Sequence, residues 1–145
     1  EIDPMLLANE LNYSYISLEY ALHYHGLIPD VARVITSVSK HRGGKIGNQF
    51  GSFHYRKITG VLFTGYTLLL SRVKQNRYIR MAEPEKAIFD LVYFRPDLGK
   101  EADFASLRLD TSKLRPKLLK QYYSQVNAFQ IKNRLDGLMN YIAAH

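Results

Sequence analysis

The five histidines are the side chains of this sequence best suited to acid–base or metal chemistry, and their spacing limits what they can do. His23 and His25 are two residues apart in a segment expected to be helical, so they point about 200° apart and cannot bind one metal ion together. His41 and His54 could meet across a hairpin, but residues 31–82 contain no carboxylate that would complete a metal site. The sequence therefore predicts no metal site.

Carboxylates that converge on Mg²⁺ would indicate a nuclease, and the expected strands carry none. Glu85 and Asp90 are five residues apart on one expected helix, so they do not face each other. We expect Glu85 to complement the helix dipole, and both carboxylates to make surface or supporting contacts. A metal-independent ribonuclease is kept as an alternative, in which His41, His54 and Lys57 would act as acid, base and phosphate clamp.

The positive charge of the chain is concentrated in its central segment. Residues 1–30 carry five carboxylates and no Lys or Arg, whereas residues 31–82 carry ten Lys or Arg residues and no carboxylate. Such a segment attracts phosphates or an acidic protein, although it could also serve solubility and pair with the acidic N-terminal residues. The residues expected to bind nucleic acid or a partner are Lys40, Arg42, Lys45, Arg56, Lys57, Arg72 and Lys74.

The composition indicates one globular domain. The 145 residues are 46% apolar and 23% charged, which is ordinary for a protein with a single core. No apolar run approaches the ~20 residues needed to cross a bilayer, so no membrane association is expected. The chain has no cysteine, which favours a reducing compartment, and we expect a cytoplasmic protein. Because it begins with Glu1, we expect it to be a fragment of something longer.

Residues 1–30 have the pattern of a helical entry segment. Asp3 and Pro4 predict the start of a first helix, because an N-cap is followed by a proline at the first helical position. Ser17 is expected to cap a second helix with its hydroxyl, and Gly26 to end it. Pro29 then keeps the chain from resuming a helix.

Residues 31–82 change to the pattern of strands. The expected strands are Arg33–Val38, Ser52–Arg56 and the antiparallel pair Tyr66–Val73 and Tyr78–Met81. In the second of these, Phe53 and Tyr55 share one face, opposite a basic exposed face. The glycines at 43, 44, 47 and 51 match neither the P-loop nor the dinucleotide fingerprint, so they are expected in hairpin turns and no cofactor is expected.

Residues 83–145 return to a helical pattern. A helix is expected from Pro84 to about Arg95, with two further helices over Arg115–Ser124 and Ala128–Ala143. Helices, then strands, then helices indicate an α+β fold with an antiparallel sheet of about four strands, flanked by N-terminal and C-terminal helices.

Four segments, in order, resemble motifs of the AbiEi antitoxin family. Tyr15–Pro29 is similar to the family's entry motif, an aromatic residue followed by [IV]-S-L-E-x-A-L-x-x-[HY]-G-L-I-P, and Val34–Val38 follows it. Phe50–Arg56 is similar to the family's G-x-F-x-Y-R strand, and Glu83–Leu91 to its P-E-K-A-[LI]-x-D-L helix. The motif residues, read as mainly structural, are Ser17, Gly26, Pro29, Tyr55, Pro84, Glu85, Lys86 and Asp90.

The resemblance implies a bacterial antitoxin and transcriptional autoregulator of a type IV toxin–antitoxin system, which acts in abortive infection. A winged helix-turn-helix module would precede residue 1 and bind operator DNA. This domain would then support neutralisation of a nucleotidyltransferase-like toxin and add non-specific DNA contacts, without being an enzyme. Besides the ribonuclease, a structural or dimerisation domain of a DNA-binding regulator is the other alternative.

Overall fold

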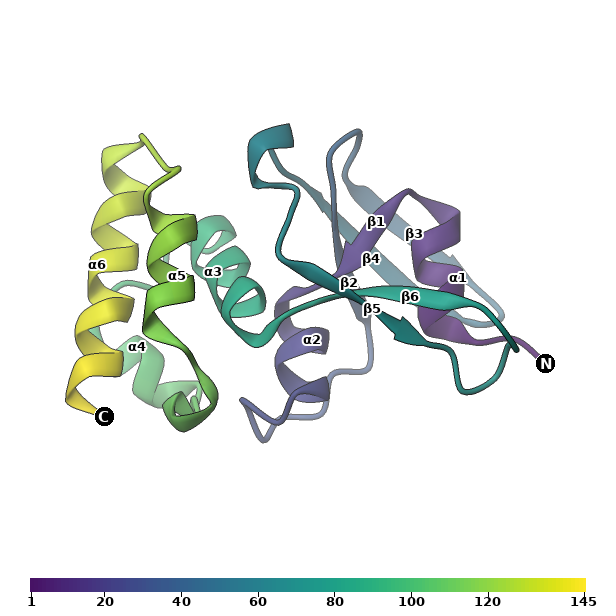
Figure 1. The fold of residues 1–145 in the computed structure, drawn as a ribbon, viewed down its shortest axis with the longest axis horizontal. Coiled ribbons are helices and arrows are strands. Elements are labelled where there is room, and N and C mark those ends of the chain that lie inside the picture. The colour runs from purple at the N-terminus through teal and green to yellow at the C-terminus, as the bar shows by residue number, and fades with distance from the viewer.

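A six-stranded sheet forms one half of the molecule and a group of helices the other, with the two termini at opposite ends (Figure 1). The computed structural model describes all residues from 1 to 145. The helices are α1 (Pro4–Leu11), α2 (Leu18–Tyr24), α3 (Pro84–Phe94), α4 (Glu101–Ser106), α5 (Pro116–Tyr123) and α6 (Phe129–Ala144), with short 3-10 turns η1 (Gly60–Leu62) and η2 (Thr111–Lys113). The strands are β1 (Ser14–Ile16), β2 (Ile35–Ser39), β3 (Gly44–Asn48), β4 (Gly51–Lys57), β5 (Tyr66–Leu70) and β6 (Tyr78–Ala82).

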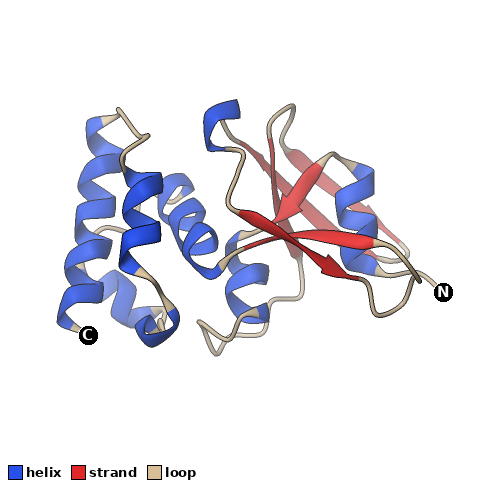
Figure 2. Cartoon of the chain, in the orientation of Figure 1, coloured by secondary structure: helices blue, strands red, loops and turns tan.

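The sheet has the strand order β3-β4-β2-β1-β6-β5 and is mixed (Figure 2). The pairs β2–β4 and β1–β6 are parallel, and the other three pairs are antiparallel. The expectation of about four antiparallel strands was therefore wrong in number and direction, although the α+β class and the β5–β6 hairpin are confirmed. Strand β1 was not predicted, because it has only three residues and lies between two helices. Strand β3 was not predicted either, because Gly44 and Gly47 were expected in turns and glycine has a low strand propensity.

Each face of the sheet is covered by different helices. On the face of β4 that carries Phe53 and Tyr55, the hydroxyl of Tyr55 donates to the carbonyl of Ala8 in α1, at 2.6 Å. On the other face, Thr36 of β2 donates to the carbonyl of Ser17 at 2.6 Å, just before α2. Phe53 and Tyr55 are buried as the alternation predicted. The two outer strands β3 and β5 are largely exposed, and Leu68 on β5 keeps 62% of its surface accessible.

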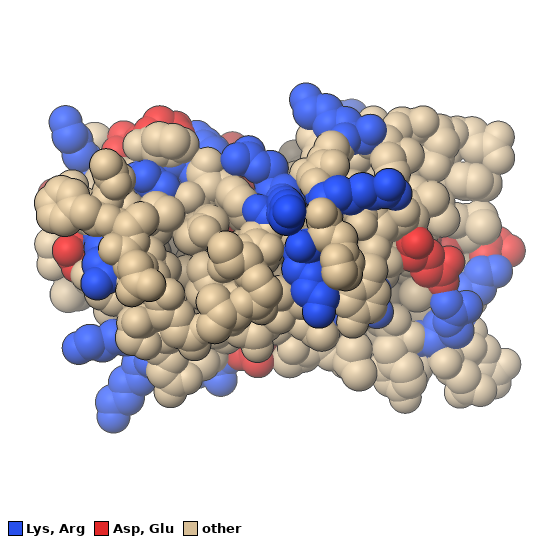
Figure 3. Space-filling model, turned by 90° about the horizontal axis from the view of Figure 1, so that it is seen from above, with Lys and Arg blue, Asp and Glu red and all other residues tan.

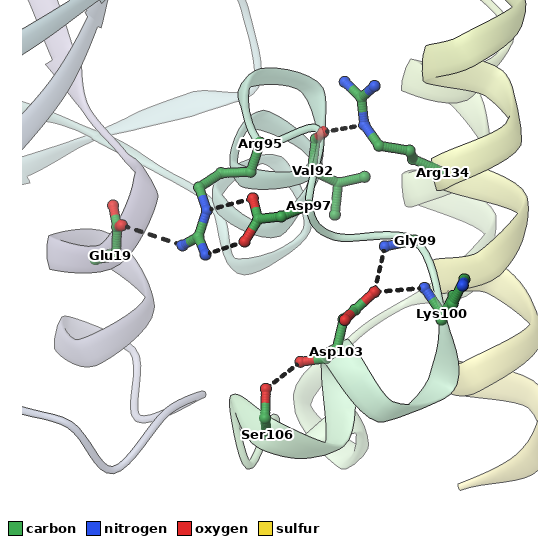
Figure 4. A network of polar contacts seen from close by, with 9 residues as sticks. All are labelled: Glu19, Val92, Arg95, Asp97, Gly99, Lys100, Asp103, Ser106 and Arg134. Carbon is green, nitrogen blue, oxygen red and sulfur yellow. Dashed lines mark hydrogen bonds and ion pairs between the residues drawn. The ribbon is translucent and has the colours of Figure 1, made fainter.

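The outer helices α5 and α6 pack against α3, and α6 holds the C-terminal end of α3. Arg134 of α6 donates to the carbonyl of Val92 at 3.0 Å (Figure 4) and to that of Tyr93 at 2.8 Å. It thereby satisfies two acceptors that the helix end leaves free. Gly137 of α6 lies so close to the preceding loop that a Cβ there would meet the carbonyl oxygen of Gly99 at 1.9 Å. The buried apolar residues of the sheet and of the helices form one continuous core.

The expected helices α3, α5 and α6 are confirmed to within one or two residues, whereas the short α4 was not predicted. Asp3 caps α1 by accepting from the backbone N–H of Met5 at 3.0 Å, as its position predicted. Gly26 follows the end of α2 with a φ of 77°, a conformation that favours glycine. None of the helices combines the length and apolar character needed to cross a membrane.

Candidate functional site

Residues from the first and last of the four motifs meet in a buried polar cluster between the sheet and α3. This buried cluster consists of Tyr15 on β1, Ser17 just after it, and Lys86 and Asp90 on α3, and all four side chains are fully buried. Asp90 accepts hydrogen bonds from the hydroxyls of Tyr15 and Ser17, both at 2.7 Å. The ammonium of Lys86 lies 2.8 Å from the Asp90 carboxylate and also donates to the carbonyl of Leu62 at 2.7 Å. Two distant parts of the chain are thus joined by one network.

The buried cluster corrects two expectations. Ser17 precedes α2 as expected, but its hydroxyl makes no capping bond and donates to Asp90 instead. Glu85 and Asp90 were expected to make surface or supporting contacts, and because both are fully buried, the surface contacts are ruled out. The reason is that α3 lies between the sheet and the outer helices, so it is covered on every side rather than along one stripe (Figure 1). The i,i+4 spacing of Lys86 and Asp90 is the sequence signal that could have revealed the ion pair.

Burial opposes the charged form of both partners of this ion pair. It raises the pKa of Asp90, while Lys86 and the two hydroxyls act in the opposite direction. It also lowers the pKa of Lys86, against the attraction of Asp90. Burial likewise raises the pKa of Tyr15 far above its ordinary value, so this hydroxyl stays protonated and can donate to Asp90. Each charge depends on the other, because loss of either partner would leave an unpaired charge in the interior.

A glycine closes the buried cluster from the side of η1. Gly65 has a φ of 82°, and a Cβ there would meet the hydroxyl of Tyr122 at 2.6 Å and Cγ of Lys86 at 2.7 Å. Leu62, whose carbonyl binds Lys86, is itself buried. No substrate can reach a lysine sealed in this way, so the buried cluster positions the chain rather than performing chemistry.

A second buried carboxylate ties α3 to the segment before α5. Glu85 accepts from the backbone N–H of Arg115 at 2.8 Å and from its guanidinium at 3.0 Å, and Glu83 binds the same guanidinium at 2.6 Å. Burial alone would raise the pKa of Glu85, but the hydrogen bonds from Arg115 outweigh it and lower the pKa. The role of Arg115 was not foreseen, because nothing in the sequence links it to Glu85 thirty residues earlier.

Three of the seven expected binding residues gather where β2 and β4 end. Ser39 and Lys57 are register partners in this parallel pair, so Lys57 lies beside the β2–β3 loop that carries Lys40 and Arg42. We call Lys40, Arg42 and Lys57 the loop cluster. The backbone of this loop is fixed, because the carbonyl of Arg42 accepts from Asn12 at 3.0 Å. Figure 3 looks at the molecule from above and shows Lys and Arg side chains gathered over its middle.

The other expected binding residues lie on two separate surfaces. Arg56 is on the α2–α3 side of β4, with its guanidinium 4.8 Å from the centre of the Phe94 ring. Lys45 is the register partner of His54 and therefore shares that side. Arg72 and Lys74 are in the β5–β6 turn, away from the loop cluster and beside the N-terminus in Figure 1. The structure thus brings together only part of the set.

The three residues of the proposed ribonuclease do not share the groove that His54 lines. His54 lines a groove with Arg56, whereas neither His41 nor Lys57 is among the residues that line it. No group of three or more His, Cys, Asp or Glu side chains is arranged to hold a metal ion. Comparison of the chain with protein-family models, with curated proteins and with solved structures finds no match.

Proposed function

We propose that this chain is the effector domain of a bacterial antitoxin and transcriptional autoregulator of a type IV toxin–antitoxin system. In this proposal it acts in the cytoplasm by binding, and the loop cluster is its contact surface. The observation that carries the proposal is that Lys40, Arg42 and Lys57 take part in none of the ion pairs of the molecule. Uncompensated cations on this loop and on the strand end beside it can engage phosphates or the carboxylates of a partner.

The ordered motifs supply the second line of support. Tyr15 and Ser17 come from the entry motif, Lys86 and Asp90 from the helix motif, and their contacts give a physical reason why such residues should occur together. The resemblance to the AbiEi family is what suggests the particular partners. These are a nucleotidyltransferase-like toxin and operator DNA, the latter bound mainly by a winged-helix module that would precede residue 1.

Charge reversal at the loop cluster tests the proposal. Arg42→Glu with Lys57→Glu should abolish protection against the proposed nucleotidyltransferase-like toxin, measured as growth under toxin co-expression. Both side chains are exposed, so the variant should remain folded by circular dichroism.

Lys117→Glu with Lys120→Glu is the matched control, because it changes the charge equally at two exposed positions of α5. The control should retain protection. Full protection by the folded Arg42→Glu, Lys57→Glu variant would show that the loop cluster is not the antitoxin surface.

A further inference from the structure

A groove of about 480 Å³ lies beside the start of α2, on the side of the sheet that carries Arg56. Its charged and imidazole groups come from three segments, with Glu19 on α2, Arg33 in the loop before β2, and His54 and Arg56 on β4. Leu18 and Val31 form apolar parts of the wall of the groove. Cavities of this size, with a few polar groups set among apolar ones, are typical of small-molecule sites.

The two arginines of the groove have no ionic partner in the molecule. Neither Arg33 nor Arg56 takes part in any ion pair. Glu19 is the only carboxylate that lines the groove, and it lies 3.7 Å from the guanidinium of Arg95. Arg95 is in turn held by Asp97, as Figure 4 shows, and their closest atoms are 2.7 Å apart. The groove therefore presents an excess of positive charge.

Two of the groups that would meet a ligand, His54 and Arg56, are held by the paired strands of the sheet. His54 and Arg56 are alternate residues of β4, which lies between β2 and β3, so they project side by side from the same face. The ring of Phe94, at the C-terminal end of α3, lies 4.8 Å from the guanidinium of Arg56 and limits its orientations. A site built on paired strands keeps its geometry better than one built on loops.

The wall of the groove includes a strained backbone position. Leu18 has a φ of 61°, which is unfavourable for a residue other than glycine. It is held there by its neighbour Ser17, whose N–H donates to the carbonyl of Thr36 at 3.0 Å and whose hydroxyl donates to Asp90 at 2.7 Å. The buried cluster thus fixes the position of the groove wall.

We infer that this groove binds a phosphomonoester attached to an apolar or aromatic body, such as a nucleoside monophosphate or the 5′-phosphorylated end of a nucleic-acid strand. Arg33 and Arg56 would bind the phosphate oxygens, since a guanidinium can donate two parallel hydrogen bonds to a phosphate. His54 lies beside Arg56 as a further donor, while Leu18 and Val31 would contact the body of the ligand. This site is separate from the loop cluster and does not depend on the antitoxin proposal.

Calorimetric titration of the folded chain with adenosine 5′-monophosphate tests the inference. We expect saturable binding, and at least tenfold weaker binding by Arg56→Ala and by Arg33→Ala. Arg72→Ala, outside the groove, should bind as the unaltered protein does. Adenosine without the phosphate should bind at least tenfold more weakly. Absence of binding at millimolar nucleotide, or equal affinity of all three variants, would overturn the inference.

Two oligonucleotides of one sequence, with a 5′-phosphate or a 5′-hydroxyl, distinguish the two sources of the phosphate. If the phosphorylated strand binds more tightly than both the hydroxyl strand and the nucleotide, and Arg56→Ala removes that difference, the ligand is a strand end. If the nucleotide binds more tightly and Arg56→Ala weakens it, the ligand is a free nucleotide. Equal binding of both strands, unaffected by Arg56→Ala, would exclude the strand end, and if the nucleotide also fails to bind, it would exclude the phosphomonoester site.

Discussion

The buried cluster and the loop cluster use similar charged residues in opposite ways. In the buried cluster, Lys86 meets Asp90 within 2.8 Å and both are shielded from water. In the loop cluster, Arg42 and Lys57 are exposed and have no carboxylate partner. A paired buried charge affects whether the chain folds, whereas an unpaired exposed charge affects what the folded chain attracts. Substitutions in the two regions should therefore change different measurements.

The largest effect is expected from Asp90→Ala, which would leave Lys86 buried without its partner. Removing one member of a buried ion pair typically costs about 3–5 kcal/mol, a large part of the stability of a small protein. Urea unfolding followed by circular dichroism would measure it. The double variant Lys86→Met with Asp90→Leu should lose less, because no charge is left unpaired. A loss under about 1 kcal/mol for Asp90→Ala would show that the ion pair does not hold the two halves together.

Gly65→Ala should be the next most damaging change, because it would force a side chain into the closed side of the buried cluster. Its Cβ would lie 2.6 Å from the Tyr122 hydroxyl at a φ of 82°. Overpacking of this kind typically costs about 1–3 kcal/mol. Gly60→Ala is the control, since nothing lies within 4 Å of a Cβ there. Equal unfolding midpoints for the two variants would contradict the close packing around Lys86.

Acidification should weaken the link between α3 and Arg115. The pKa of Glu85 is lower in the folded chain, so its contribution is fully present above its ordinary pKa of 4.5. That contribution is lost as the pH falls from there through the folded-state pKa. The pKa of Asp90 is raised, so its contribution to stability changes with pH in the opposite direction. The contribution of Glu85 is therefore isolated by comparing the unaltered chain with Glu85→Gln in thermal unfolding from pH 7 to pH 3. We expect the stability difference between them to shrink on acidification, and a constant difference would contradict the lowered pKa.

The smallest effect on stability is expected in the loop cluster. Arg42→Glu with Lys57→Glu should change the free energy of unfolding by no more than about 0.5 kcal/mol, because neither side chain is buried or paired. Its effect should appear in binding to a non-specific DNA duplex, measured by fluorescence anisotropy at several salt concentrations. Each lost phosphate contact should reduce the log–log salt dependence by about 0.9. An unchanged salt dependence together with a large loss of stability would reverse the comparison between the two clusters.

The sequence predicted the features that depend on local periodicity. It placed α3, α5 and α6, the β5–β6 hairpin, and the burial of Phe53 and Tyr55, because each follows from a repeat of apolar residues or from a capping residue. It did not predict β3, whose glycines become a strand only through pairing with β4. The parallel pairing of β2 with β4 could not be predicted from the sequence either, since it depends on contacts between segments that are separated in the chain.

The candidate sites divide along the same line. The cations of the loop cluster were found from the sequence, because counting Lys, Arg, Asp and Glu along the chain requires no structure. The same counting also grouped Arg72 and Lys74 with them, since it ignores where the chain turns back. The meeting of Tyr15 with Asp90 could not be read from one sequence, because 75 positions separate them. Arg33 was missed for the same reason, since only the fold brings it into the same groove as Arg56.

The two edges of the sheet differ in how they would behave toward another chain. The β3 edge carries Lys45 and two glycines, and charge and flexibility discourage a foreign strand from pairing there. The β5 edge instead exposes Leu68 and Leu70, which keep 62% and 59% of their surface accessible. An unpaired strand with apolar side chains is a template for unwanted association. The tendency of the protein to aggregate therefore depends on the β5 edge. The basic residues of the loop cluster lie elsewhere and provide no repulsive charge at that edge.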